Sequence, residues 1–215
     1  MTTRTQHATS ACSRILRLVI SLTVSGLALY PIPVLGGDIT AVSVDAASRV
    51  VKLYGAGGIR GLESYQTGIL VSSSGHILTV LSTAIDSEAI DCVLDDGRRY
   101  TASLVGADLH RELAVLKIEG INLPYFKISA DSPRQAIGTR VLALSNLFGV
   151  AVGDERVSIQ HGVVAAHVPL RARRGSHEAA YRGDVYILDC TTNNPGSPGG
   201  CLINWQGDCI GMLGK

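Results

Sequence analysis

The chain has 215 residues, enough for one domain or for two small barrels packed as one unit. Its 19 basic and 18 acidic residues nearly cancel, which excludes a strong overall field of the kind that attracts nucleic acids or acidic membranes. Hydrophobic residues make up 46% of the chain, aromatic residues 5%, and there are 24 glycines. This composition excludes a disordered chain and favours a β-rich fold with a core of Val, Ile and Leu.

The first predicted element is a targeting segment over residues 1–37. Arginines precede an apolar run, Leu18 to Gly37, that ends in small residues, and this order is typical of a secretory signal. Pro31 and Pro33 interrupt the run and leave it short for a membrane span of about 20 residues. We therefore expect an exported protein, periplasmic or extracellular, with a cleaved signal. An uncleaved membrane anchor is the alternative.

After a short linker at residues 38–47, the sequence predicts only short strands, and no segment shows a competing helical period. Gly, Asn and Asp turns separate the strands, and Asp95–Asp96–Gly97 carries the strong Asp-Gly hairpin signal. The strands are expected within residues 49–55, 66–84, 90–108, 112–118, 139–149, 157–168, 184–190 and 199–213.

A proline-containing connection at about residues 122–138 divides these strands into two groups. We expect a domain over residues 48–215 with an N-terminal barrel at about 48–121 and a C-terminal barrel at about 138–215. Two packed β-barrels are the most economical all-β architecture for this pattern.

Four cysteines remain after a cleaved signal, and an exported protein can pair them. They are Cys92, Cys190, Cys201 and Cys209. In a hairpin that turns at Gln206–Gly207, Cys201 lies opposite Met212, and strict alternation then places Cys201 and Cys209 on opposite faces. This argues against a bridge between those two. A bridge from Cys190 and four free thiols both remain open. Without a CxxC pair, no metal site is expected, and no cofactor either.

Five segments in a fixed order carry a family resemblance. They are TGILVSSSGHILT, LDDGRRYTASLVGADLHRELAVLKI, IGTRVLALSNLFG, VVAA and YILDCTTNNPGSPGGCLINWQGDCIGM. Together they resemble trypsin-like serine proteases of the HtrA (DegP-like) type, over residue 48 to the end. The resemblance implies a trypsin-like double β-barrel, the protease domain only, with a second barrel that lacks its closing strand.

The resemblance also assigns three catalytic positions, because the family uses a serine nucleophile, a histidine base and an aspartate that orients the histidine. The family motif TNNHV matches TVLSTA and puts Ser82 at the histidine position. DPRTDLALLKI matches DLHRELAVLKI and puts Glu112 at the aspartate position. GNSGG matches GSPGG and puts Pro198 at the serine position.

These substitutions remove the chemistry of the family. A hydroxyl at Ser82 has no basicity near neutral pH. Pro198 has neither a nucleophilic group nor a backbone N–H, so the oxyanion hole implied by the resemblance, with Gly196 as its other donor, loses a donor as well.

A rebuilt catalytic site would have to take its nucleophile and its base from other residues. Ser197 is a weak candidate nucleophile, since it lies one residue early and the following proline biases it towards extended backbone. The better interpretation of the histidines is a turn residue for His76, a solvated loop for His110, and strand faces for His161 and His167. Cys190 is better explained as a buried thiol or a disulfide partner than as a nucleophile.

The sequence thus favours a catalytically inactive HtrA-like pseudoprotease that binds a protein or peptide or regulates an active relative. The alternative is an active serine endopeptidase with a non-standard site at Ser197, and a decayed domain without a present role is a third interpretation. The basic segment Arg171–Arg182 is interpreted as a solvated connection, so no nucleic-acid partner is expected.

Overall fold

The fold is described by a computed structural model that covers residues 38–55, 64–87, 89–129, 132–170, 173–174, 177–178 and 181–214. The predicted signal at residues 1–37 lies outside these ranges. In the part of the chain that is described, no helix has the length and apolar character needed to cross a membrane.

The first described element is a helix, α2 (Ile39–Ala47), which occupies the stretch expected to be a linker. Asp38 caps it, since its carboxylate accepts a hydrogen bond from the N–H of Thr40 at 3.0 Å. Ala46 and Ala47 at its C-terminal end are fully buried. Residues 39–47 therefore form a packed helix rather than a free linker. The helix was missed because it has only nine residues, and its contact with the core combines Ile39 and Val42 with two small alanines.

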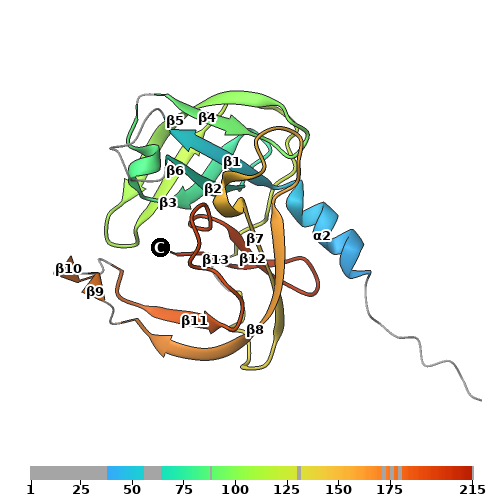
Figure 1. The fold of residues 1–215 in the computed structure, drawn as a ribbon, viewed down its shortest axis with the longest axis vertical. Coiled ribbons are helices and arrows are strands. Elements are labelled where there is room, and N and C mark those ends of the chain that lie inside the picture. The colour runs from blue at the N-terminus through green and yellow to red at the C-terminus, as the bar shows by residue number, and fades with distance from the viewer. Residues whose placement is uncertain are drawn as a thin grey trace, which may run out of the picture. The chain divides into compact units, whose positions relative to one another are not determined.

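Six strands close the first barrel in the order β1-β2-β3-β6-β5-β4, and each pairs antiparallel with both neighbours (Figure 1). Gly75 makes the tight β2–β3 turn, because its φ is 95° and an added Cβ would lie 2.4 Å from the carbonyl oxygen of Ile118. The strands are β1 (Val50–Gly55), β2 (Tyr65–Leu70), β3 (His76–Val80), β4 (Ile90–Val93), β5 (Arg99–Asp108) and β6 (Leu113–Lys117). A short 3-10 helix, η1 (Thr83–Ile85), follows β3.

The second half is an open five-stranded sheet in the order β11-β8-β7-β12-β13. Its outer strands, β11 and β13, each pair with one neighbour among the described residues. The expected all-β class and the open second barrel are thus confirmed. The elements are β7 (Arg140–Ser145), η2 (Leu147–Gly149), β8 (Ser158–Pro169), β11 (Asp184–Leu188), β12 (Cys201–Asn204) and β13 (Cys209–Met212), with a small hairpin of β9 (Arg173–Arg174) and β10 (His177–Glu178).

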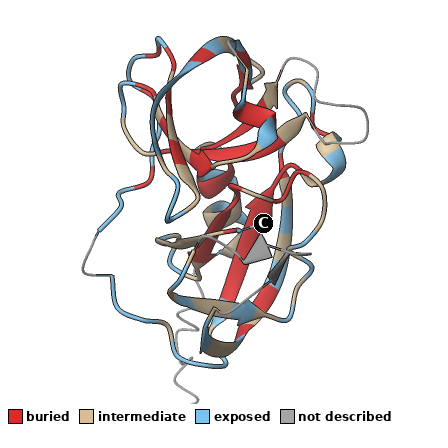
Figure 2. Ribbon diagram, turned by 90° about the vertical axis from the view of Figure 1, so that its left-hand side faces the viewer, coloured by how far each residue is buried: buried red, intermediate tan, exposed pale blue. Residues whose placement is uncertain are grey.

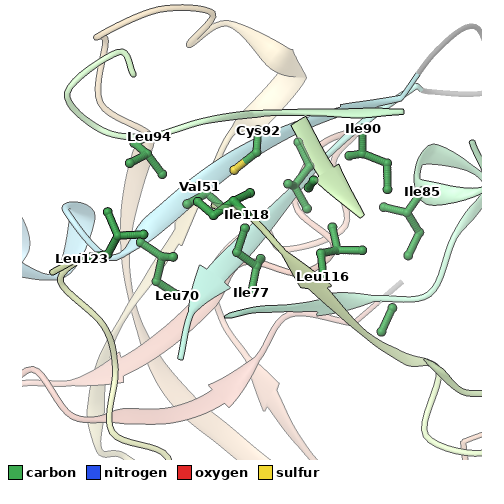
Figure 3. Close-up of a cluster of buried hydrophobic side chains, with 13 residues drawn as sticks. Val51, Leu70, Ile77, Ile85, Ile90, Cys92, Leu94, Leu116, Ile118 and Leu123 are labelled. Carbon is green, nitrogen blue, oxygen red and sulfur yellow. The ribbon is translucent and has the colours of Figure 1, made fainter. Parts of the chain in front are cut away.

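Three groups of buried side chains hold these layers together (Figure 2). The first fills the closed barrel and includes Leu70, Ile77 and Leu116 (Figure 3). The second, here called the inter-barrel core, combines residues of β1 and β2 with residues of α2, β7 and β12. The third lies on the other face of the open sheet. The inter-barrel core is what fixes the two sheets against each other, because its members come from both.

The β12–β13 hairpin has the predicted pairing of Cys201 with Met212, but a bulge follows it. Ile203 pairs with Cys209, so Ile210 is an extra residue on β13. The extra residue reverses the alternation, and both Cys209 and Met212 contact the inter-barrel core that contains Cys201. The predicted placement of Cys201 and Cys209 on opposite faces is therefore wrong. Their Sγ atoms lie 3.4 Å apart.

Candidate functional site

The loop at residues 193–200 connects β11 to β12 and contains the position expected for the nucleophile. Gly196 and Gly199 both have a φ of 84°, which makes the loop turn twice within four residues. Within the loop, the N–H of Ser197 donates to the carbonyl of Asn194 at 3.0 Å. The ring of Pro198 sits between the two glycines, so the half-buried tip of the loop offers no hydroxyl and no N–H from this residue.

Thr67 of β2 fastens this loop to the first barrel. Its N–H donates to the carbonyl of Pro198 at 3.0 Å, and its Oγ1 donates to the carbonyl of Gly196 at 2.6 Å. The same Oγ1 accepts from the N–H of Asn146 at 2.9 Å, at the end of β7. A Cβ added to Gly199 would lie 1.9 Å from the carbonyl oxygen of Thr67. One buried threonine therefore joins both sheets to the loop.

Ser197 is fully buried, and its Oγ has no hydrogen-bond partner among the described residues. An attacking serine must present its oxygen to a substrate and to a base. Among the described residues, the hydroxyl of Ser197 is shielded from solvent and bonds to no base. Its role as a nucleophile stays a prediction.

Ser82 follows β3 and caps η1, where its Oγ accepts from the N–H of Ala84 at 3.1 Å. The same Oγ donates to Oε1 of Gln66, a buried side chain at the start of β2. Both hydrogen-bonding roles of the Ser82 hydroxyl are thus used inside the protein.

Gln66 extends the network from Ser82 towards the loop. Its Nε2 donates to Oγ1 of Thr79 at 2.7 Å and to the carbonyl of Val80 at 2.9 Å, and Oγ1 of Thr79 donates to the carbonyl of Thr67 at 2.6 Å. These hydroxyl and amide groups satisfy one another, and none of them titrates near neutral pH. We call Ser82, Gln66, Thr79 and Thr67 the hydroxyl–amide network.

Glu112 lies beside this network through its backbone. Its carbonyl accepts from the N–H of Leu81 at 2.8 Å, next to Ser82, and Val80 pairs with Leu113 in the β3–β6 ladder. Its φ is 53°, an uncommon backbone conformation for a residue with a Cβ. The structure therefore brings together the three positions that the resemblance assigned, Ser82, Glu112 and Pro198, around strands β2 and β3.

The described imidazoles lie in other environments. None of them forms a hydrogen bond with Ser82 or Ser197 among the described residues. His76 sits at the β2–β3 turn, where its Nδ1 is 2.8 Å from Oγ of Ser72. The other described imidazoles are His110 on an exposed turn, His161 with its ring 5.3 Å from that of Trp205, and His167 with its ring 4.9 Å from that of Tyr186.

Two of the cysteines are poor nucleophiles. Burial raises the pKa of Cys92, inside the first barrel, to about 12. Burial also raises the pKa of Cys190, which is half-buried under the open sheet. The described cysteines are all free thiols, so the bridge from Cys190 that the sequence left open does not form in this structure.

A buried lysine in β1 docks the loop that follows β7. Lys52 is fully buried, and its Nζ donates to the carbonyls of Gly153 at 2.7 Å and Glu155 at 2.9 Å. Tyr54 on the same strand donates its hydroxyl to the carbonyl of Ala151 at 2.5 Å. Because burial penalises its charge, the pKa of Lys52 is lowered. These contacts hold the β7–β8 loop against the first barrel.

Sequence reasoning missed Gln66, Thr67 and Lys52. The sequence carries only a weak signal for these residues. Gln66 and Thr67 are adjacent polar residues at the start of a strand that is otherwise apolar, and Lys52 is a single lysine in the run VVKLYG. Such residues read as the solvent face of a strand unless the partner that covers them is known.

Comparisons with known proteins agree with this fold. Residues 66–212 match the model of the trypsin-like peptidase domain. The probable periplasmic DegP-like serine endoprotease of Chlamydia pneumoniae is 34% identical over 146 residues, which is 68% of this chain and 28% of that protein. Its counterpart in Pseudomonas putida (strain GB-1) is 32% identical over 156 residues, covering 71% of this chain and 29% of that protein.

Solved structures give the same answer. The HtrA-type protease AlgW, solved with a tripeptide, superposes with a TM-score of 0.65 at 30% identity, over 82% of this chain and 54% of that one. The serine endoprotease of Yersinia pestis superposes with a TM-score of 0.61 at 26% identity, over 82% and 57%. The chain spans less than a third of the length of the curated relatives it matches. With the double-barrel fold and these matches together, the chain belongs to the trypsin-like peptidase family, as an HtrA-like protein related over the protease domain.

Proposed function

We propose that this chain is a non-cleaving member of its family, which binds protein or peptide segments or regulates an active relative. The observation that carries the proposal is the environment of Pro198. Its carbonyl is bonded to Thr67, it has no N–H to give an oxyanion, and it has no group that attacks a carbonyl carbon.

The base position supports the same conclusion. An acyl transfer at neutral pH needs a group that accepts the proton of the nucleophile, with a pKa near the working pH. Ser82 presents a hydroxyl that is already committed to Gln66 and Ala84. The hydroxyl–amide network fills the space between the base position and the loop with groups that are satisfied and neutral. Glu112 retains a carboxyl group, but there is no imidazole at position 82 for it to orient.

The alternative is an active serine endopeptidase that uses Ser197. Among the described residues the Ser197 hydroxyl has no hydrogen-bond partner, so it is not committed to another group, and this favours the alternative. Its complete burial works against this function, because a substrate carbonyl cannot reach it without a rearrangement of the loop. The loop is held by Thr67 at Gly196 and Pro198, on both sides of Ser197.

The relatives support the proposed ligand class and location. The related AlgW structure contains a tripeptide, and the curated relatives are named as periplasmic. We extend both properties to this chain, which gives an exported protein with a protein or peptide ligand. The basic and apolar N-terminal segment supports export, with an uncleaved anchor as the alternative.

Proteolysis of an unfolded substrate tests the proposal. The full chain is incubated with casein at neutral pH, beside an active trypsin-like protease as positive control and the Ser197→Ala variant as matched control. Wild type and variant are expected to leave casein intact equally. Cleavage by wild type that disappears in the variant would establish the Ser197 endopeptidase instead.

Restoring the missing groups tests the reason for inactivity. The variant Ser82→His/Glu112→Asp/Pro198→Ser places the family's side chains at the three positions. Cleavage of casein is expected to rise at least about a hundredfold over wild type, because nucleophile, base and oxyanion donor return together. A version that also carries Gln66→Ala frees space for the imidazole and is expected to be at least as active.

A further inference from the structure

We propose that Cys201 and Cys209 are a redox-active thiol pair, which closes to an intrachain disulfide by exchange with a small disulfide of the oxidised glutathione type. The β-bulge at Ile210 brings the two side chains to the same face, with their Sγ atoms 3.4 Å apart. This site lies outside the catalytic positions and does not depend on whether the chain cleaves substrates.

The position of the pair in the fold permits the bond. Disulfide sulfurs are about 2.05 Å apart, so the two atoms must approach by roughly 1.4 Å. Cys201 begins β12 and is fully buried in the inter-barrel core, so it cannot move far. Cys209 begins β13, a short edge strand that pairs only with β12 among the described residues. The edge strand can make the small shift.

The two thiols have different environments. Cys201 donates a hydrogen bond to Sγ of Cys209, and this bond stabilises the thiolate of Cys209 and lowers its pKa. Complete burial raises the pKa of Cys201. Cys209 is partly exposed whereas Cys201 is fully buried, so Cys209 is the sulfur of the pair that an external disulfide reaches first.

The reaction is two exchange steps. The Cys209 thiolate attacks one sulfur of the small disulfide RSSR, which forms a mixed disulfide and releases RS⁻. Cys201 then loses its proton to the released thiolate and attacks Sγ of Cys209, which expels the second RS⁻. The two cysteines are oxidised by two electrons, and RSSR is reduced to two molecules of RSH, which carry the two protons.

The bond would tie the edge of the open sheet to the loop that contains Pro198. Directly after β13, Leu213 donates its N–H to the carbonyl of Gly200 at 2.8 Å and accepts from the N–H of Gly199 at 2.9 Å. Cys201 follows Gly200 in sequence. Oxidation therefore joins both strands that hold the C-terminal half of the loop, and we expect it to slow the opening of that half.

Peptide mapping of the oxidised full chain tests the proposal. The reduced protein is incubated with oxidised glutathione at pH 8, its remaining thiols are alkylated, and it is cleaved after Trp205 without reduction. The Cys12→Ser/Cys92→Ala/Cys190→Ser variant is mapped in parallel. Cys201 is then the one cysteine left before Trp205, so a link to the N-terminal fragment is assigned to it. The expected product in both proteins is a Cys201–Cys209 link. A Cys190–Cys209 link, or both thiols alkylated, would overturn the proposal.

Two single variants test the order of the steps. Cys201→Ser is expected to stop at one glutathione adduct on Cys209. Cys209→Ser is compared with its parent in a Cys12→Ser/Cys190→Ser background. It is expected to react with glutathione at least about tenfold more slowly than that parent, because the thiols that remain, Cys92 and Cys201, are both fully buried. An adduct that forms on Cys201 faster than on Cys209 would contradict the assignment of Cys209 as the attacking thiol. Near-UV circular dichroism verifies that each variant retains its tertiary structure.

Discussion

The closed first barrel and the open second sheet are both built from antiparallel strands, but they differ in how many neighbours the strands have. In the barrel every strand has two neighbours, and residues such as Ile77 and Leu116 are fully buried. In the open sheet the outer strands have one neighbour each, and Ile187 on β11 is 45% exposed. We therefore expect a core truncation to cost more in the barrel than on the outer strand of the open sheet. The loop with Pro198 belongs in sequence to the sheet but is held by Thr67 of the barrel, so its shape depends on both halves.

Truncating one leucine in each half is expected to give the largest difference between the barrel and the open sheet in the free energy of unfolding. Leu116→Ala in the barrel is expected to lower the free energy of unfolding by about 4 kcal/mol, because a fully buried leucine leaves a cavity. Leu188→Ala on the half-buried edge strand β11 is expected to cost about 1 kcal/mol. Urea unfolding of both variants measures the difference. Equal losses would mean that the open sheet is as well packed as the barrel.

The contact between loop and barrel is tested by a pair of glycines with similar backbone angles. Gly199 has a φ of 84° and lies against Thr67, whereas Gly138 has a φ of 86° and open space around it. Gly199→Ala is expected to cost about 3 kcal/mol or more, from backbone strain plus the clash. Gly138→Ala is expected to cost only the strain, about 1 kcal/mol. If thermal unfolding gave the same loss for both, the close approach of the loop to β2 would be incorrect.

The burial of Cys92 in the apolar core of the barrel predicts that stability depends on pH in the alkaline range. The pKa of Cys92 is about 12 in the folded protein against an ordinary value of 9.0, because burial disfavours the thiolate. The folded state then holds more protons than the unfolded state above pH 9, so the contribution is complete below pH 9 and is lost as pH rises towards 12.

This loss is about 2 to 3 kcal/mol by pH 11 for Cys92 alone. It is measured as the difference between wild type and Cys92→Ala in urea unfolding at pH 8 and pH 11, since other groups titrate in both proteins. The gap between the two proteins is expected to narrow by that amount. A gap that stays constant would show that water reaches Cys92.

Removing the hydroxyl of Thr67 is expected to give the smallest difference in the free energy of unfolding among these tests. Thr67→Val keeps the shape but leaves the carbonyl of Gly196 and the N–H of Asn146 without their partner, which is expected to cost about 2 kcal/mol. Thr67→Ser retains the hydroxyl and is the matched control, with an expected loss of about 1 kcal/mol from the missing methyl group. Denaturant unfolding compares them. A valine variant as stable as the serine variant would remove Thr67 as the link between barrel and loop.

Strand positions followed well from the sequence, because alternation and turn residues are local signals. The Asp95–Asp96–Gly97 turn and the pairing of Cys201 with Met212 are examples, since each depends on a hairpin with a short turn. The helix over Ile39–Ala47 did not follow, because it is short and its contact with the core combines Ile39 and Val42 with two small alanines. The side chains around Ser82 did not follow either. Gln66 bonds to Thr79 of β3, and Thr67 bonds to Gly196 of the loop, and neither partner is local in sequence.

The bulge at Ile210 shows why the alternation of side chains along a strand does not always predict the face on which a residue lies. One extra residue changes the face of the sheet on which Cys209 lies, and no residue pattern in CLINWQGDCIGM predicts this bulge. The resemblance assigns Ser82, Glu112 and Pro198 by motif, whereas the relation between two side chains on neighbouring strands depends on the register of each pair, which a motif does not give.

Labelling with a fluorophosphonate probe decides whether this chain contains an activated serine. The full-length protein and a known active trypsin-like protease are exposed to the probe, and intact mass is recorded. We expect a single adduct on the active protease and no mass change on this chain, since the serine of the loop, Ser197, is buried and its hydroxyl bonds to no base in the part of the chain that the structure describes. A stoichiometric adduct that maps to Ser197 and vanishes in Ser197→Ala would show that the chain is an active serine hydrolase.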